Sequence, residues 1–141
     1  MRTTIRHEFV ETIPEDLDDG VLYVSITYST AVHKCVCGCG HEVVTPLAPR
    51  QWWLTFDGEV VSLAPSIGNW SFPCRSHYWI RVGEVHRART FTDTEIAAVR
   101  ADESERLRRP SEPQSPRRGN AISAPKHCFA RSLGWLQRMF K

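Results

Sequence analysis

The chain has no long hydrophobic run. No segment approaches the ~18 consecutive apolar residues of a membrane-spanning helix, so we expect no integral membrane span. Residues 1–19 contain no apolar stretch of the length found in secretory signal peptides, and they are acidic from Glu8 onward. From these absences we expect a cytoplasmic protein.

Several sequence signatures of catalysis are also missing. The chain has no Gly-x-Ser-x-Gly motif of an α/β-hydrolase nucleophile and no His-Glu-x-x-His motif of a zinc peptidase. It has no Cys-x-x-Cys pair, which is the usual mark of a redox dithiol. No recognised signature therefore identifies a reaction, and the chemistry has to be inferred from the few cysteines.

The chain has five cysteines, and four of them are grouped with one histidine in two short motifs. Cys35, Cys37 and Cys39 occupy alternate positions, and Cys74-x-x-His77 follows about 35 residues later. An odd number of thiols in a cytoplasmic protein favours reduced cysteines over a disulfide framework. Because thiolate and imidazole together select zinc over hard cations, we predict a zinc site. The alternative interpretation is a set of buried cysteines or a redox dithiol.

The sequence does not decide which ligands hold the metal. A tetrahedral zinc ion takes four protein ligands, or three and a water molecule, whereas the two motifs offer five. His33 and His41 are further candidates at the edge of the first motif. Since the motifs are far apart in the chain, zinc would join the first strands to the last hairpin. Cys128 is remote from both motifs, and we interpret it as a packing residue.

The first two thirds of the chain predict a small, mainly antiparallel β domain. Residues 21–28 form a β-branched and aromatic run that is typical of a buried strand. Asp57-Gly58 separates two β-prone segments and predicts a hairpin, and residues 78–87 predict a second one. We expect six or seven short strands between residues 4 and 89, and a zinc-binding β domain over residues 1–91.

Helices are expected after this domain, which makes the fold class α+β overall. Thr92 and Glu95 have the spacing of a capping box, so we predict a polar helix over residues 92–109 that Pro110 ends. Residues 110–125 are rich in Pro, Ser and Arg and predict a linker. Residues 126–141 predict a basic amphipathic helix that binds a protein partner or the domain's own sheet.

Charge is unevenly distributed along a chain of net charge +2. Residues 1–99 carry eight basic and twelve acidic residues, whereas residues 100–141 carry ten basic and four acidic ones. A basic tail suits an anionic partner, although a solvated tail has the same composition. The zinc motifs themselves have few basic neighbours and lack the spacing of a two-Cys, two-His finger, so we do not expect a nucleic-acid partner.

Several motifs occur in order along the chain: Cys35-x-Cys37-Gly38-Cys39-Gly40, Trp53-Leu54-Thr55-Phe56-Asp57-Gly58, Val61-Ser62-Leu63-x-Pro65-Ser66, Trp70 and Cys74-Arg75-Ser76-His77-Tyr78-x-Ile80. Together they resemble a small bacterial family of unknown function whose members are described as predicted metal-binding proteins. The resemblance covers roughly residues 20–87. Members occur beside bacterial genes for ubiquitin-like proteins and for homologues of their activating and conjugating enzymes. The resemblance therefore implies a pathway, and it implies such a modifier or its enzymes as partners.

We consider two classes of function. In the first, the chain is a zinc-binding accessory protein of a bacterial ubiquitin-like modification system, with a structural zinc and a binding surface that includes Trp52-Trp53 or Trp70. In the second, it is a hydrolase that processes or removes the modifier. The first is our main prediction and the second is the alternative.

The hydrolase alternative has two forms. A zinc-bound water could attack the amide, with Glu42 or Glu59 as general base. Alternatively, Ser66 in a Pro/Gly-rich segment could be the nucleophile with His77 as its base, which requires that His77 is not a zinc ligand. Ser76 is a poorer nucleophile candidate because neighbours in a strand point to opposite faces. A hydrogen bond between Ser66 and His77 would favour the hydrolase, and a closed four-ligand site with an inert Ser66 would favour the accessory protein.

Overall fold

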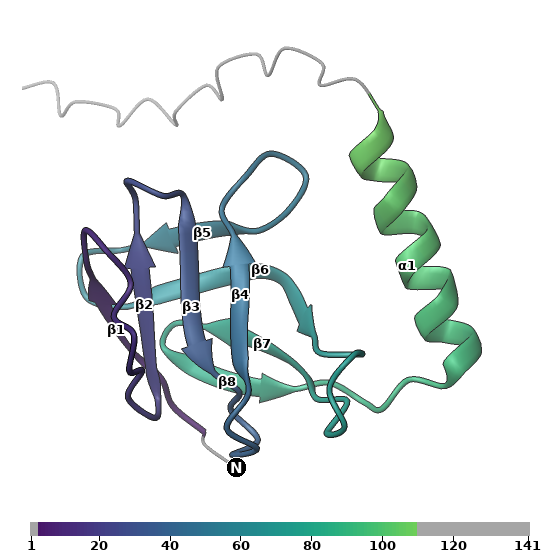
Figure 1. Cartoon of the computed structure of the whole chain (residues 1–141), viewed down its shortest axis with the longest axis horizontal. Coiled ribbons are helices and arrows are strands. Elements are labelled where there is room, and N and C mark those ends of the chain that lie inside the picture. Colours follow the sequence, from purple (N-terminus) through teal and green to yellow (C-terminus); the bar gives the residue numbers. More distant parts are fainter. Residues whose placement is uncertain (1–2, 110–141) are drawn as a thin grey trace, which may run out of the picture. The chain divides into compact units, whose positions relative to one another are not determined.

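A computed structural model describes residues 3–109, which form two four-stranded sheets followed by one helix (Figure 1). The first sheet contains β1 (Arg6–Phe9), β2 (Val21–Ser25), β3 (Thr30–Lys34) and β4 (Glu42–Pro46). The second contains β5 (Trp53–Phe56), β6 (Val61–Gly68), β7 (His77–Arg81) and β8 (Glu84–Arg87), and the helix is α1 (Asp93–Arg108). The predicted fold class, mainly antiparallel β and α+β overall, is confirmed for the described residues.

The first sheet has the order β1-β2-β3-β4, with β1 parallel to β2 and the other pairs antiparallel. All five residues of β2 are buried, as its β-branched composition predicts. The strand predicted over residues 21–28 ends earlier, at Ser25, because the chain turns before β3 and Ser29 adopts a φ of +48°. The run therefore supplies one strand and the turn after it.

The second sheet has the order β5-β6-β7-β8, and all of its pairs are antiparallel. The hairpin predicted at Asp57-Gly58 is confirmed, although its loop has four residues and Asp57 Oδ1 accepts hydrogen bonds from the amides of Glu59 (2.9 Å) and Val60 (2.8 Å). The second hairpin is also confirmed, with a two-residue turn at Val82 and Gly83, both at positive φ.

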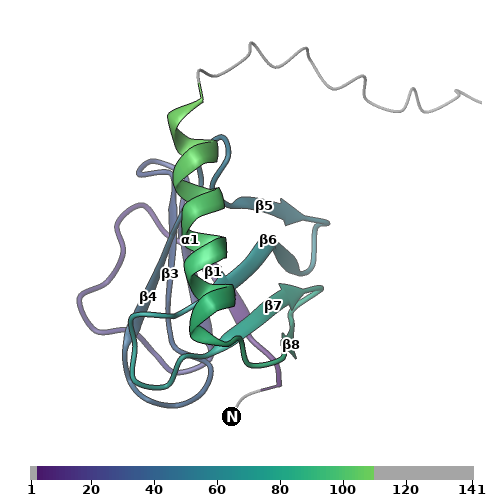
Figure 2. The same cartoon turned by 90° about the vertical axis from the view of Figure 1, so that its right-hand side faces the viewer.

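The main core lies between the two sheets, whose strands run across one another in Figures 1 and 2. Buried aliphatic side chains of β2, β3 and β4 meet those of β6 and β7, together with Tyr78. Leu63, Ile67, Tyr78 and Ile80 thus point into the core. Because side chains alternate along a regular strand, Trp79, which lies between the buried Tyr78 and Ile80, points to the outer face of the second sheet.

The helix α1 begins with the predicted capping box. Thr92 accepts a hydrogen bond from the amide of Glu95, whose side chain accepts one from the amide of Thr92. Ile96 is its one buried residue, and ion pairs join Arg75 to Asp93 and Arg89 to Glu95. Contacts in its first turn therefore attach this polar helix to the domain.

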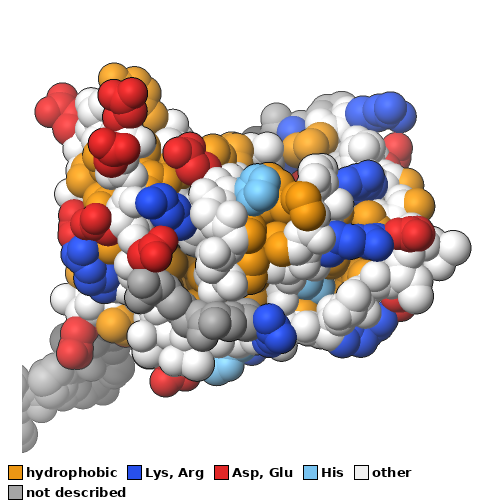
Figure 3. All heavy atoms as spheres, turned by 60° about the horizontal axis from the view of Figure 1, so that its bottom comes forward, with side chains coloured by type: hydrophobic (Ala, Val, Ile, Leu, Met, Phe, Trp, Pro, Cys, Tyr) orange, Lys and Arg blue, Asp and Glu red, His pale blue; other side chains and the backbone are white. Residues whose placement is uncertain are grey.

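No helix among the described residues is long and apolar enough to cross a membrane. On the face in Figure 3, acidic and basic side chains are interspersed with hydrophobic ones. The linker and amphipathic helix predicted over residues 110–125 and 126–141 lie outside the described residues, as does Cys128. The predicted division at residues 91, 109 and 125 stays a prediction.

Candidate active site and cysteine group

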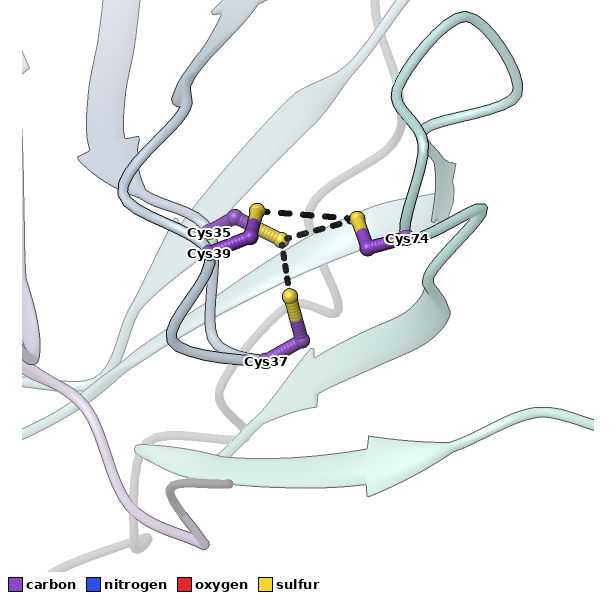
Figure 4. Close-up of side chains that lie close together, drawn as sticks. All are labelled: Cys35, Cys37, Cys39 and Cys74. Carbon is purple, nitrogen blue, oxygen red and sulfur yellow. Dashed lines mark hydrogen bonds between the residues drawn. The ribbon is translucent and has the colours of Figure 1, made fainter.

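Four cysteine sulfurs converge on one point (Figure 4). Cys35, Cys37 and Cys39 follow β3, and Cys74 lies in the connection between β6 and β7. All four Sγ atoms lie within 4.8 Å of one another, with separations of 3.4 Å for Cys35–Cys37, 3.9 Å for Cys35–Cys74 and 3.6 Å for Cys39–Cys74. We call these four residues the cysteine group.

A tight turn brings three of the thiols together. Strand β3 ends at Lys34, after which the amide of Cys35 donates to His41 O (2.8 Å) and the amide of Gly38 donates to Cys35 O (3.0 Å). Gly38 and Gly40 take φ of +90° and +79°, where a Cβ would be strained although neither has an atom within 4 Å of that position. The alternating cysteines therefore surround one point instead of lining one face of a strand.

The geometry of the cysteine group fits a metal ion. In a tetrahedral site with Zn–S bonds of about 2.3 Å, neighbouring sulfurs lie about 3.8 Å apart, close to the observed separations. The four thiols are free, so no disulfide competes for them. Four thiolates fill a tetrahedral ion, which leaves no position for a catalytic water. The group can therefore hold a metal ion as a structural site.

The electrostatics of the thiols also favour a cation. Burial and the neighbouring thiols of Cys39 and Cys35 raise the pKa of Cys37 to about 12. Burial acts to raise the pKa of Cys74 as well, but the backbone and hydroxyl of Ser76 and the thiols of Cys37 and Cys39 lower it to about 7. Four thiolates at this spacing would repel one another without a cation to neutralise them.

A buried polar network supports Cys35. Ser76 Oγ lies 3.1 Å from Cys35 Sγ, and Asn69 Nδ2 donates to Ser76 Oγ (2.8 Å) and to Cys35 Sγ (3.7 Å). The same amide donates to Tyr78 Oη (3.4 Å), which bonds His33 Nε2 at 2.8 Å. Asn69 and Tyr78 were not identified as supporting residues from the sequence. The sequence indicates this role only through their position beside the Cys74 motif. This network holds Cys35 in place through groups that are themselves buried.

Ser66 and His77 form a hydrogen-bonded pair on adjacent strands. His77 Nε2 lies 3.0 Å from Ser66 Oγ. Ser66 belongs to an irregular segment of β6, where the register with β7 shifts between Leu63 and Ile67. Such bulges re-aim side chains, and this one places the hydroxyl on the outer face beside the imidazole. The pair has the spacing required for a nucleophile and its general base.

Aromatic rings enclose the imidazole of His77, which is 8% exposed. The ring centroids of Trp70, Trp79 and Phe91 lie 4.9, 5.5 and 4.7 Å from its own. Burial lowers the pKa of His77; the Arg89 backbone opposes that shift, and the Arg89 charge adds to it. The imidazole is therefore neutral near pH 7, which is the form that accepts a proton from serine.

The second nitrogen of His77 has no acidic partner in the part of the chain that the structure describes. Its Nδ1 is buried, and the backbone of Arg89, not a carboxylate, is the polar group that interacts with the imidazole on this side. Glu95 and Asp93, the carboxylates that follow β8, instead pair with Arg89 and Arg75. Within residues 3–109, the catalytic candidates therefore form a Ser–His pair without a third carboxylate.

The other histidines and glutamates that the sequence suggested as ligands or bases lie outside the cysteine group. His77 lies outside the cysteine group, and so does His33, whose buried ring bonds Tyr78. His41 Nδ1 lies 3.3 Å from Cys39 Sγ, and its ring stacks on Phe72 at 4.7 Å, so it neighbours the group. The exposed Glu42 and Glu59 are not members of the group, which has no carboxylate among the described residues.

A small cavity of about 150 Å³ adjoins both parts of the site. It is lined by Cys37, Cys74, Ser76 and His77 and by residues 87–90. Two members of the cysteine group and the imidazole of His77 therefore border the same cavity.

Fold and site together define a small β protein with four cysteines placed so that they could hold a metal ion and with a Ser–His pair on one sheet. The family model described as "Bacterial ubiquitination-like system serine protease (BubE)" matches residues 9–88, more than half of the chain. The chain belongs to this family. Searches of curated proteins and of solved structures found no match.

The family description corrects the order of the two functional predictions. The motifs had suggested a family of unknown function within a ubiquitin-like pathway, and membership in such a bacterial system is confirmed. The description "serine protease" supports the hydrolase alternative more than the zinc-binding accessory protein that we predicted first. The physical reason is the 3.0 Å Ser66–His77 contact, which sequence spacing alone does not reveal.

Proposed function

We propose that this protein is a serine hydrolase of a bacterial ubiquitination-like system, with Ser66 as nucleophile and His77 as general base. The observation that carries the proposal is the 3.0 Å contact between Ser66 Oγ and His77 Nε2 on the outer face of the second sheet. The lowered pKa of His77 supports it, because a neutral imidazole is available at neutral pH. The family description supports the reaction class.

The proposed reaction has two stages. In the first, Ser66 Oγ attacks the substrate carbonyl carbon as its proton moves to His77 Nε2. The C–N bond then breaks, the leaving amine takes the proton from His77, and an acyl-serine ester remains. In the second, water gives a proton to His77 and attacks the ester, which releases a carboxylic acid and restores the Ser66 hydroxyl.

We propose that zinc occupies the cysteine group and holds the fold without taking part in the reaction. A bound zinc would join the β3–β4 connection to the β6–β7 connection and thereby fix the start of β7. A chain of this size buries little core per residue, so a metal crosslink contributes substantially to its stability. His77 is then free to act as a base.

We propose that the substrate is a ubiquitin-like modifier, either in precursor form or joined to a target through an amide. Membership in a ubiquitination-like system supports this substrate class. Components of the same system, such as the activating and conjugating enzymes, are the other proposed partners.

Labelling with a fluorophosphonate probe tests this function. Such probes react with serine hydroxyls that a neighbouring base activates, so the wild type is expected to acquire one adduct at Ser66, identified by peptide mass spectrometry. Ser66→Ala and His77→Gln should not be labelled. Ser71→Ala is the matched control, because Ser71 is an exposed hydroxyl of the β6–β7 connection that contacts Arg100.

The accessory-protein alternative predicts a different outcome. A protein that binds the modifier without cleaving it would keep Ser66 unlabelled and would leave a modifier precursor intact. If the wild type is folded, contains metal and shows neither labelling nor cleavage, the proposed hydrolase function is wrong.

A further inference from the structure

Strand β6 presents a line of small residues on the outer face of the second sheet. Ser62, Ala64, Ser66 and Gly68 are all half-buried, whereas Val61, Leu63 and Ile67 on the opposite face are in the core. Ser62 and Ala64 flank the buried Leu63, and Ser66 and Gly68 flank the buried Ile67, so all four lie on the outer face, with the half-buried Pro65 and the register shift between the two pairs. We call them the β6 strip.

Tryptophans flank the strip on both neighbouring strands. Trp53 of β5 lies directly opposite Ala64 in the sheet register and is 54% exposed. On the other side, Trp79 of β7 faces outward, since its neighbours Tyr78 and Ile80 are fully buried. Adjacent strands are about 4.8 Å apart, so the backbones of β5 and β7 lie roughly 10 Å apart with β6 between them.

A third tryptophan closes one end of the strip. A Cβ added to Gly68 would lie 2.4–2.5 Å from atoms of the Trp70 ring, so this ring covers the residue. Trp70 is held there by stacking on Phe91, with ring centroids 5.2 Å apart. From Ser66 the strip is therefore blocked toward Gly68 and continues toward Ala64 and Ser62.

We propose that the β6 strip binds the acyl side of the substrate as an extended peptide of small residues. This inference rests on the proposed hydrolase function. Small floor residues let a peptide backbone approach closely, and the indoles of Trp53 and Trp79 would cover it from both sides. A bulky side chain next to the scissile carbonyl would meet Trp70 or one of these walls.

The acyl side is assigned because it is the constant part of every substrate in the proposed function. A modifier that is released from different targets keeps its own C-terminal residues, whereas the leaving amine changes. A fixed strip of defined width beside Ser66 suits the constant part. The blocked end beyond Gly68 leaves one direction for these residues, along Ala64 and Ser62.

Fluorogenic coumarin amides of tetrapeptides test the strip. The acyl residues before the scissile bond would be Gly-Gly, Ala-Ala or Leu-Leu, with the rest of the peptide unchanged. We expect kcat/KM to be at least about tenfold higher for Gly-Gly than for Leu-Leu, a range that pocket size alone can produce. Trp53→Ala should raise KM for the Gly-Gly substrate several-fold.

Phe56→Ala is the matched control for Trp53→Ala. Both residues are aromatic, lie on β5 and are about half exposed (46% and 54%), but Phe56 contacts His7 and Phe9 of the first sheet and not the strip. If the two variants have equal effects, or if the Leu-Leu substrate is cleaved as well as the Gly-Gly substrate, the proposed role of the β6 strip is wrong. Labelling of Ser66 in the same protein would still support the hydrolase function.

A binding measurement covers the case in which no tetrapeptide is cleaved. In the Ser66→Ala chain, titration with a tetraglycine amide is expected to change tryptophan fluorescence in a saturable way, and tetraleucine amide is not. Adding Trp53→Ala to this chain should remove most of the change, and adding Phe56→Ala should preserve it. The absence of a saturable change would overturn the inference, and the absence of Ser66 labelling in the wild type would separately overturn the proposed function.

Discussion

Trp70 occupies the space that a side chain at Gly68 would need. A Cβ at position 68 would lie 2.4 Å from Cε2 of the indole. The same indole makes an edge contact with the His77 ring, with centroids 4.9 Å apart. The absence of a side chain at Gly68 therefore allows the Trp70 ring to lie in contact with His77, the proposed general base.

Gly68→Ala is expected to displace Trp70 and to reduce both stability and activity. Overpacking of a filled site costs roughly 1–3 kcal/mol, so urea denaturation should show a loss of that size. The Ser66 labelling rate should also fall, because His77 loses a neighbour that fixes its ring. In the double variant Gly68→Ala/Trp70→Ala, the added methyl group should cost far less than it does alone. Equal costs in the two backgrounds would contradict the packing relationship.

The pH dependence of Ser66 labelling should report His77. Only the neutral imidazole accepts the serine proton, so the rate should rise with pH and level off, with its midpoint below the ordinary value of 6.5 because burial lowers the pKa. Arg89→Gln removes a positive charge that contributes to the lowering, so its midpoint should move to higher pH. A wild-type midpoint above 6.5, or no movement in Arg89→Gln, would contradict this electrostatic account.

Metal content should depend on four of the five cysteines. We expect about one zinc per chain by elemental mass spectrometry, and separate serine substitutions of Cys35, Cys37, Cys39 and Cys74 should each lower the zinc content and the midpoint of thermal unfolding. Cys128→Ser is the control that the chain itself offers, and it should retain zinc. His77→Gln should retain zinc too, because His77 lies outside the cysteine group. Loss of zinc in His77→Gln would show that it is a ligand.

Asn69→Ala should weaken metal retention without removing a ligand. The Asn69 amide donates to Cys35 Sγ and to Ser76 Oγ, and loss of such outer contacts typically costs about 10–100-fold in metal affinity. Competition with a chromophoric chelator measures the affinity, and Ser71→Ala in the same connection is the control. Unchanged affinity in Asn69→Ala would show that the network supports the fold but not the metal site.

Local sequence signals predicted the local structure well. Asp57-Gly58 predicted its hairpin because the Asp57 carboxylate and a glycine at φ +105° act within the loop itself. Thr92 and Glu95 predicted their capping box for the same reason, since both partners lie within one helical turn. Each of these features depends on residues that are close together in the chain.

The division of the strands into two sheets and the parallel β1–β2 pair could not be predicted in this way. They depend on pairings such as Arg6 with Val21, which no short motif encodes. The position of the His77 side chain could not be predicted either. Its spacing from Cys74 suits a shared metal, but Arg75 at φ +43° turns the chain and β7 then directs the imidazole toward Ser66.

The short segment from Cys74 to His77 constrains how this family can diverge. It begins at a proposed metal ligand and ends at the proposed general base, and β7 starts at that base. An inserted residue would change the length of the connection that joins the proposed metal ligand to the first residue of β7. The exposed loop between β5 and β6 carries neither a proposed metal ligand nor a proposed catalytic residue, so its length can change freely. We therefore expect insertions and deletions among relatives to collect in that loop and to spare the four residues from Cys74 to His77.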